Sequence, residues 1–73
     1  MSPDRLAYMA NQIGRFFAHQ PHDKAVAEIA AHLRRFWDPR MRAGIIAHPD
    51  GETVRLDPTV REAVDRLAEQ SVS

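Results

Sequence analysis

The residue types best suited to recognition chemistry are concentrated in residues 32–42. This stretch holds four arginines next to Phe36 and Trp37. Guanidinium groups bind carboxylates and phosphates through paired hydrogen bonds, and arginine with large aromatic side chains is the mixture enriched at protein–protein hot spots. We therefore predict a partner-binding surface made first by Arg34, Arg35, Trp37, Arg40 and Arg42, and second by the mid-helix amides Asn11 and Gln12.

The residues that usually carry catalysis or bind metals are not grouped in this sequence. The four histidines form no i,i+4 pair, whereas a zinc site needs three or four converging ligands. The chain has no cysteine, its three glycines stand apart, and its serines are Ser2, Ser71 and Ser73. It therefore offers neither an oriented nucleophile nor a phosphate-binding loop. We predict no active site, no metal and no cofactor in this chain, and hence no enzyme.

The charge balance bears on nucleic-acid binding. Net charge is zero, from ten basic and ten acidic side chains, whereas proteins that bind polyanions are usually strongly basic. Nine of the ten bases are arginine, which favours specific contacts, although high genomic G+C content would give the same bias. We predict no nucleic-acid partner. Two alternatives stay open, a self-associating helical interaction module and a small nucleic-acid-binding regulator.

Three pairs of a capping residue and proline divide the chain: Ser2-Pro3, Asp38-Pro39 and Asp57-Pro58. Each pair is typical of a helix start, and Asp23 offers a further cap after Pro21. They predict helices over residues 3–19, 24–37, 39–47 and 58–70. The expected fold is a single all-α domain over residues 1–73, with a disordered tail at 71–73.

Helical spacing of apolar residues predicts how the first two helices pack. Each carries one stripe, made by Leu6, Met9, Ala10, Ile13, Phe16 and Phe17 in the first and by Val26, Ile29, Ala30, Leu33, Phe36 and Trp37 in the second. Such stripes favour an antiparallel hairpin whose aromatic side chains pack in the core by default. Trp37, at the open end next to the arginines, is the best candidate for an exposed anchor. The last helix has a narrow apolar face, which favours fraying or docking on a partner.

Length and hydropathy limit the remaining possibilities. A chain of 73 residues without cysteine has a marginal core, and partner binding is one way to stabilise it. No apolar run approaches a membrane span, and the N-terminus lacks the pattern of a signal peptide. We expect a soluble cytoplasmic protein with no membrane contact.

Several residue strings resemble one known family. They are Met9-Ala10-Asn11-Gln12-Ile13-Gly14, Phe16-Phe17 and Ala30-Ala31-His32-Leu33-Arg34-Arg35-Phe36-Trp37-Asp38-Pro39-Arg40-Met41. Together they resemble the delta subunit of NAD-dependent formate dehydrogenase. The resemblance covers about residues 5–48, with a weaker match at residues 56–58 and 60–63, while residues 49–56 and the tail add no support.

The resemblance implies an accessory subunit of a cytoplasmic molybdenum- or tungsten-containing formate dehydrogenase. In that family the alpha subunit holds the metal–pterin centre and iron–sulfur clusters. The beta and gamma subunits carry FMN, further clusters and the NAD site. The delta subunit carries no cofactor and helps to assemble or stabilise the complex, so the alpha subunit is the expected main partner.

Overall fold

Four helices and their connections make up the chain. The computed structural model describes the backbone of residues 1–72 and the side chains of residues 1–70. The helices are α1 (Pro3–Phe17), α2 (His22–Phe36), α3 (Pro39–Ala47) and α4 (Pro58–Val72), with no strand among residues 1–72. The predicted all-α class is confirmed. The tail predicted to be disordered lies outside the residues described in full, although the α4 helix continues to Val72.

Capping side chains fix two of the helix starts. The Ser2 hydroxyl accepts the Arg5 N–H at 3.2 Å, and the Asp38 carboxylate accepts the Met41 N–H at 2.8 Å. Both helices have proline in their first turn, as predicted. The cap predicted at Asp23 is wrong: α2 begins at His22 after Pro21, with no side-chain cap, and Asp23 lies within its first turn. An acid there still interacts favourably with the helix dipole.

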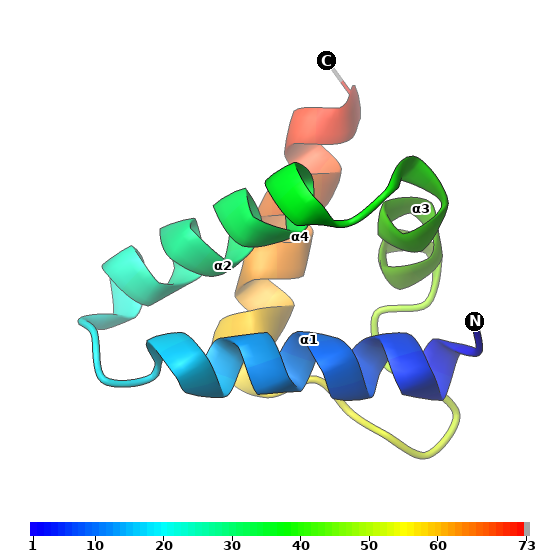
Figure 1. The fold of residues 1–73 in the computed structure, drawn as a ribbon, viewed down its shortest axis with the longest axis horizontal. Helices are drawn as coiled ribbons and strands as arrows, with labels where there is room; N and C mark the ends of the chain where they lie inside the picture. Colours follow the sequence, from blue (N-terminus) through cyan, green and yellow to red (C-terminus); the bar gives the residue numbers. More distant parts are fainter. Residues whose placement is uncertain (73) are drawn as a thin grey trace.

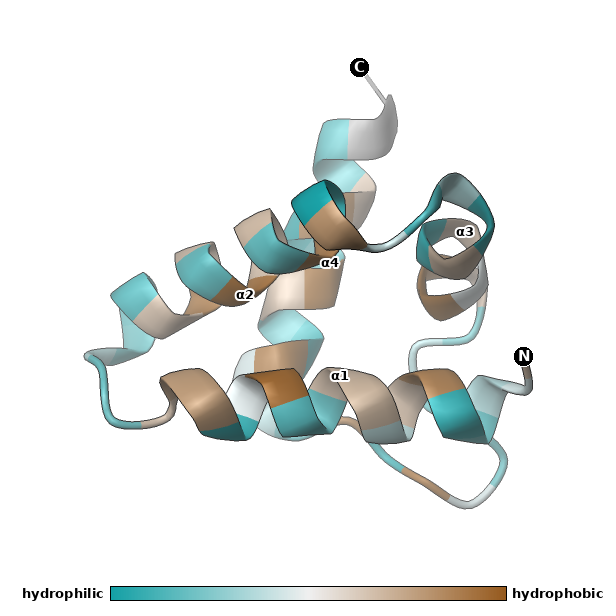
Figure 2. Cartoon of the chain, in the orientation of Figure 1, coloured by the Kyte–Doolittle hydropathy of each residue, from teal (hydrophilic) through white to brown (hydrophobic). Residues whose placement is uncertain are grey.

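The helices surround the core from several directions (Figure 1). α1 and α2 run in opposite directions and diverge from the turn at residues 18–21, and α3 lies at their open end. α4 passes behind both. The predicted antiparallel pair is therefore present but splayed, because α2 packs more extensively on α4 than on α1. Hydrophobic and hydrophilic residues alternate around the helices (Figure 2), as expected for helices with one buried face.

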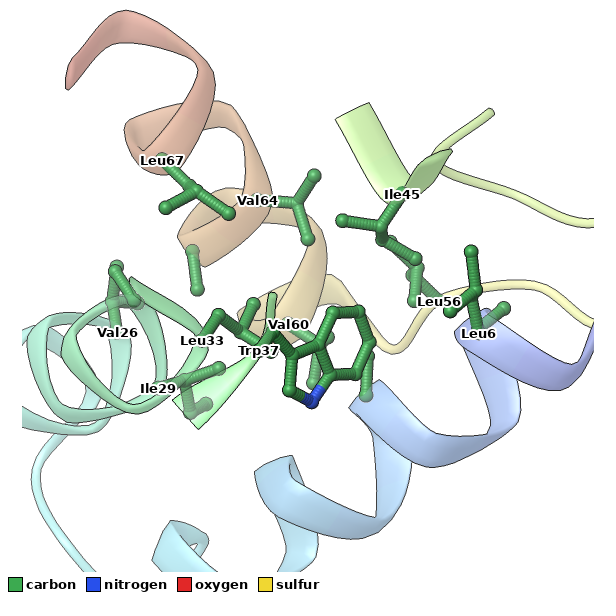
Figure 3. Packing of buried hydrophobic residues seen from close by; sticks show 14 residues of the cluster. Leu6, Val26, Ile29, Leu33, Trp37, Ile45, Leu56, Val60, Val64 and Leu67 are labelled. Carbon is green, nitrogen blue, oxygen red and sulfur yellow. The ribbon is translucent and has the colours of Figure 1, made fainter. Parts of the chain in front are cut away.

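The apolar face of α4 is an integral part of the core. Val60, Ala63, Val64 and Leu67 are each 1% exposed or less. They belong to one cluster with Ile29 and Leu33 of α2, which are fully buried (Figure 3). The expectation that this helix frays or docks only on a partner is wrong, because its narrow face matches the buried face of α2.

The two aromatic doublets divide between core and surface. Trp37 is only 6% exposed, and its indole lies beside Leu33 and Val60 (Figure 3), so the expected exposed anchor is a core residue. Phe16 and Phe36, both assigned to the buried stripes, are 73% and 67% exposed. Adjacent helical residues point about 100° apart, and the extended backbone at Trp37 turns its side chain inward.

Gly14 sets the distance between α1 and α4. A Cβ at this position would overlap Cγ2 of Val60. Glycine normally costs about 1 kcal/mol relative to alanine inside a helix. The close approach of the two helices accounts for its presence here.

Candidate functional site

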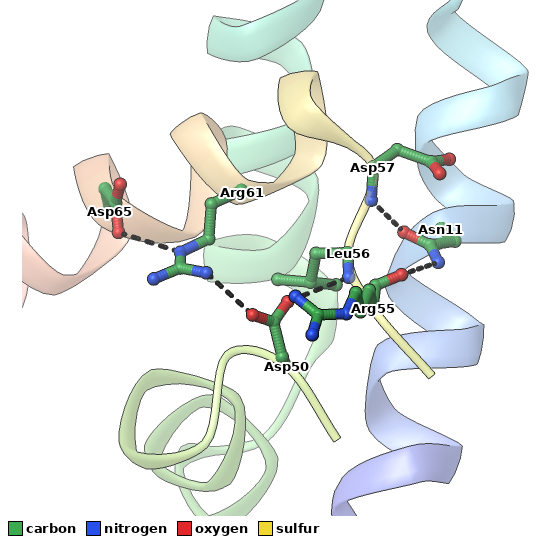
Figure 4. A network of polar contacts seen from close by, with 7 residues as sticks. All are labelled: Asn11, Asp50, Arg55, Leu56, Asp57, Arg61 and Asp65. Atoms are coloured by element: carbon green, nitrogen blue, oxygen red, sulfur yellow. Dashed lines mark hydrogen bonds and ion pairs between the residues drawn. The ribbon is translucent and has the colours of Figure 1, made fainter. Parts of the chain in front are cut away.

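Asn11 and Asp4 of α1 hold the connection between α3 and α4. The Asn11 amide donates to the carbonyl of Arg55 at 2.9 Å and accepts the Asp57 N–H at 2.9 Å (Figure 4). Asp4 accepts the N–H and hydroxyl of Thr53, each at 2.9 Å, and the Val54 N–H at 3.1 Å. Asn11, predicted to contact a partner, therefore uses both ends of its amide inside the chain.

Asp50 is itself part of the connection between α3 and α4 and stabilises it through hydrogen bonds. Its carboxylate accepts the Leu56 N–H and an N–H of Arg61, both at 3.0 Å (Figure 4). The Leu56 N–H is the main cause that lowers the pKa of Asp50, and the Thr53 N–H is the main cause that lowers the pKa of Asp4. The backbone N–H groups of Thr53, Val54 and Leu56 are thus held by carboxylates.

These two carboxylates predict a loss of stability in acid. A carboxyl group whose pKa is lowered by folding stabilises the native state above its ordinary value of 3.8, and this contribution is lost as the pH falls through the folded pKa. The free energy of unfolding in urea, measured from pH 6 to pH 2.5, should decline below about pH 4. Asp4→Asn should flatten that decline and lower stability at pH 6, whereas an unchanged profile would contradict the role of Asp4.

An open apolar groove lies between α1 and α2. Its volume is about 490 Å³. The apolar side chains that line it are Met9, Ile13, Phe16, Phe17, Phe36 and Trp37. Gln12 and His32 add polar edges. We call this feature the α1–α2 groove.

A row of rings crosses the groove from one helix to the other. Phe16 and Phe17 meet edge to face with centroids 5.2 Å apart. The Phe17 and His32 rings are 6.3 Å apart, and the His32 and Phe36 rings are 4.7 Å apart. The row places the two exposed phenylalanines at its ends, so their exposure is part of one surface.

Two arginines border the groove on the α2 side. Arg34 and Arg35 line an adjacent hollow that shares Phe17, His32 and Phe36 with the groove. Arg34 donates to the side-chain oxygen of Gln70. Arg35 is exposed and forms no hydrogen bond or ion pair with any residue that the structure describes. We call Arg34 and Arg35 the basic flank.

The other predicted contact residues are placed elsewhere. Arg42 donates to the carbonyls of Trp37 and Arg34, the latter at 3.1 Å, and so caps the end of α2. Arg40 is exposed on α3, beside Met1 and Asp38 rather than the groove. Gln12 lines the groove and donates to the Tyr8 hydroxyl at 3.2 Å. The predicted surface is thus divided, with only its Arg34, Arg35 and Gln12 members exposed beside the groove.

Sequence reasoning missed Phe16 and Phe36 as surface residues. Each is the first member of an aromatic doublet, Phe16-Phe17 and Phe36-Trp37. A doublet on a helix cannot direct both rings into one narrow core face. That geometry was the available signal that one ring of each doublet lies outside the core.

Two further features of the described residues concern metal binding and membrane insertion. Within that part of the chain, no three His, Cys, Asp or Glu side chains lie close enough together to hold a metal ion. None of the helices described there combines the length and apolar character needed to cross a membrane.

The fold and the groove define a small all-α protein with an open apolar groove on its surface. Its family is shown by a family-model match over residues 5–64, which run from the first turn of α1 into α4. The chain belongs to the FdsD family, the delta subunit of NADH-dependent formate dehydrogenase. No curated protein matches the chain. No solved structure matches it either.

Proposed function

We propose that this chain is a non-catalytic accessory subunit that binds and stabilises, or helps to assemble, a cytoplasmic molybdenum-containing NAD-dependent formate dehydrogenase. The observation that carries this proposal is the delta-subunit family match over residues 5–64. This range includes both walls of the α1–α2 groove. The family match thus indicates which complex the chain binds, and the groove is a surface by which the chain could bind it.

The alpha subunit is the proposed direct partner, within a complex that also contains beta and gamma subunits. We assign the molybdenum–pterin centre, the iron–sulfur clusters and FMN to those larger subunits. The chemistry of this chain supports that assignment, since it has no cysteine thiolate to hold a cluster.

Two exposed aromatic side chains support a binding role. Single exposed apolar residues are common on protein surfaces. Phe16 and Phe36, however, belong to one row of rings and line one groove. A chain with so small a core gains stability when a partner covers such a surface.

Expression of the alpha, beta and gamma subunits with and without this chain tests the accessory role. Size-exclusion chromatography would measure the amount of assembled complex, and elemental analysis would measure molybdenum per alpha subunit. We expect both, or the assembled amount alone, to fall without the chain. Equal assembly, equal molybdenum content and equal thermal stability of the two preparations would contradict the proposal.

A further inference from the structure

We propose that the α1–α2 groove receives one amphipathic helix of the partner subunit, with its apolar side between Phe16 and Phe36 and an acidic residue against the basic flank. This inference rests on the proposed function and deepens it. It assigns the surface and the chemistry of the segment that binds there.

The length and the apolar lining of the groove suit a helix. Met9, Ile13 and Phe17 line it at intervals of four residues along α1. They span about 12 Å, or about two helical turns. Phe36 and Trp37 form the opposite wall at the end of α2. A helix that inserts apolar residues at i, i+3 or i+4, and i+7 covers such a length.

Trp37 leaves one polar group for the occupant. Its side chain is 6% exposed and lines the groove, yet its indole N–H has no acceptor among the residues that the structure describes. The nitrogen lies on the edge of the ring turned away from Val64 and Ile45 (Figure 3). The N–H is not a buried group without a partner, so it reaches solvent at the groove. A glutamine or carboxylate oxygen on the occupant would be a suitable acceptor for this N–H in place of solvent.

Charge selects a partner segment over a second copy of this chain. Arg35 is exposed and unpaired within the described residues, and Arg34 lies next to it on the same hollow. Glu28 is the one acidic residue that lines this hollow. A two-fold dimer through this surface would bring two identical hollows together, each with two arginines and one glutamate, and so would add no net negative charge to offset the flank. An acidic helix complements the flank, and a second copy does not.

Matched substitutions test the surface in the co-expressed complex. Phe16→Ala and Phe36→Ala should each weaken binding by about 30-fold or more, the loss typical of a hot-spot residue. Tyr8→Ala removes an aromatic ring that is 54% exposed but does not line the groove, and should bind as wild type does. Arg35→Glu should weaken binding most at low salt, whereas Arg15→Glu, on another hollow of α1, should not.

Folding and binding are separated by measuring each isolated variant first. All five substituted residues are exposed, so far-UV circular dichroism of the variants should match that of the wild type. If the wild type does not bind formate dehydrogenase subunits, the proposed function falls. If the wild type binds and both phenylalanine variants bind equally well, the groove assignment alone falls.

Photo-crosslinking identifies the occupant. Benzoylphenylalanine placed at position 36 should cross-link to a partner-subunit peptide that has helical apolar spacing and acidic residues, and the same group at position 8 should not. A cross-link from position 36 to a second copy of this chain, or to a peptide without acidic residues, would overturn the proposal.

Discussion

A chain that ends at Asp57 and so lacks α4 should lose its helical fold. Val60, Ala63, Val64 and Leu67 are each 1% exposed or less in the core. Burial of one valine or leucine side chain contributes about 1.5–3 kcal/mol. The net stability of so short a chain, after the entropy cost of folding, is only about 3–5 kcal/mol. Removal of the whole buried face therefore exceeds the stability available.

Far-UV circular dichroism and thermal melting measure this loss. A matched control ends at Gln70 and keeps every residue of the described core. We expect the control to melt cooperatively near the wild-type midpoint, and the chain of residues 1–57 to show weak helical signal without a cooperative transition. A cooperative melt of the shorter chain would mean that α4 is dispensable and would restore the idea of a helix that docks only on a partner.

Trp37→Ala should destabilise the isolated chain by about 3–5 kcal/mol. The large indole belongs to the core cluster and lies beside Leu33 and Val60 (Figure 3). Its removal leaves a cavity in the core, and the cost of such a substitution includes both the lost burial and the cavity. The substitution thus threatens most of the stability of the chain.

Urea unfolding followed by far-UV circular dichroism measures the Trp37 effect, because the chain has no other tryptophan for fluorescence. Phe36→Ala is the matched control in the same doublet, and it should cost less than about 1 kcal/mol since the ring is 67% exposed. Equal costs at the two positions would contradict the division of the doublet between core and surface. This difference in stability cost matters for binding studies. A Trp37 variant would lose binding because it unfolds, whereas a Phe36 variant would lose binding because it lacks a contact side chain.

The helices could be predicted from local sequence because local contacts define their ends. Ser2 and Asp38 bond to N–H groups three residues ahead, and such caps are visible as Ser-Pro and Asp-Pro pairs. α2 starts earlier than predicted because Pro21 supplies the start without any capping side chain. α3 begins and ends where the sequence predicted.

The candidate site could be predicted only in part because its parts meet through tertiary contacts. Asn11 bonds to residues 44 and 46 positions away, and no local pattern specifies those partners. Arg42 turns back to cap α2, which removes it from the predicted surface. Apolar spacing identified the stripe on α2 but not the helix that packs against it. Because α4 packs on most of that stripe, part of the surface between α1 and α2 stays uncovered and forms the groove.

Co-expression of a tagged copy of this chain with the formate dehydrogenase subunits tests the central claim most directly. Size-exclusion chromatography followed by mass spectrometry would identify what elutes with the tag. The account predicts stoichiometric co-elution with the alpha subunit. Elution of the chain alone, while the other subunits assemble normally without it, would contradict a role as an accessory subunit of the complex.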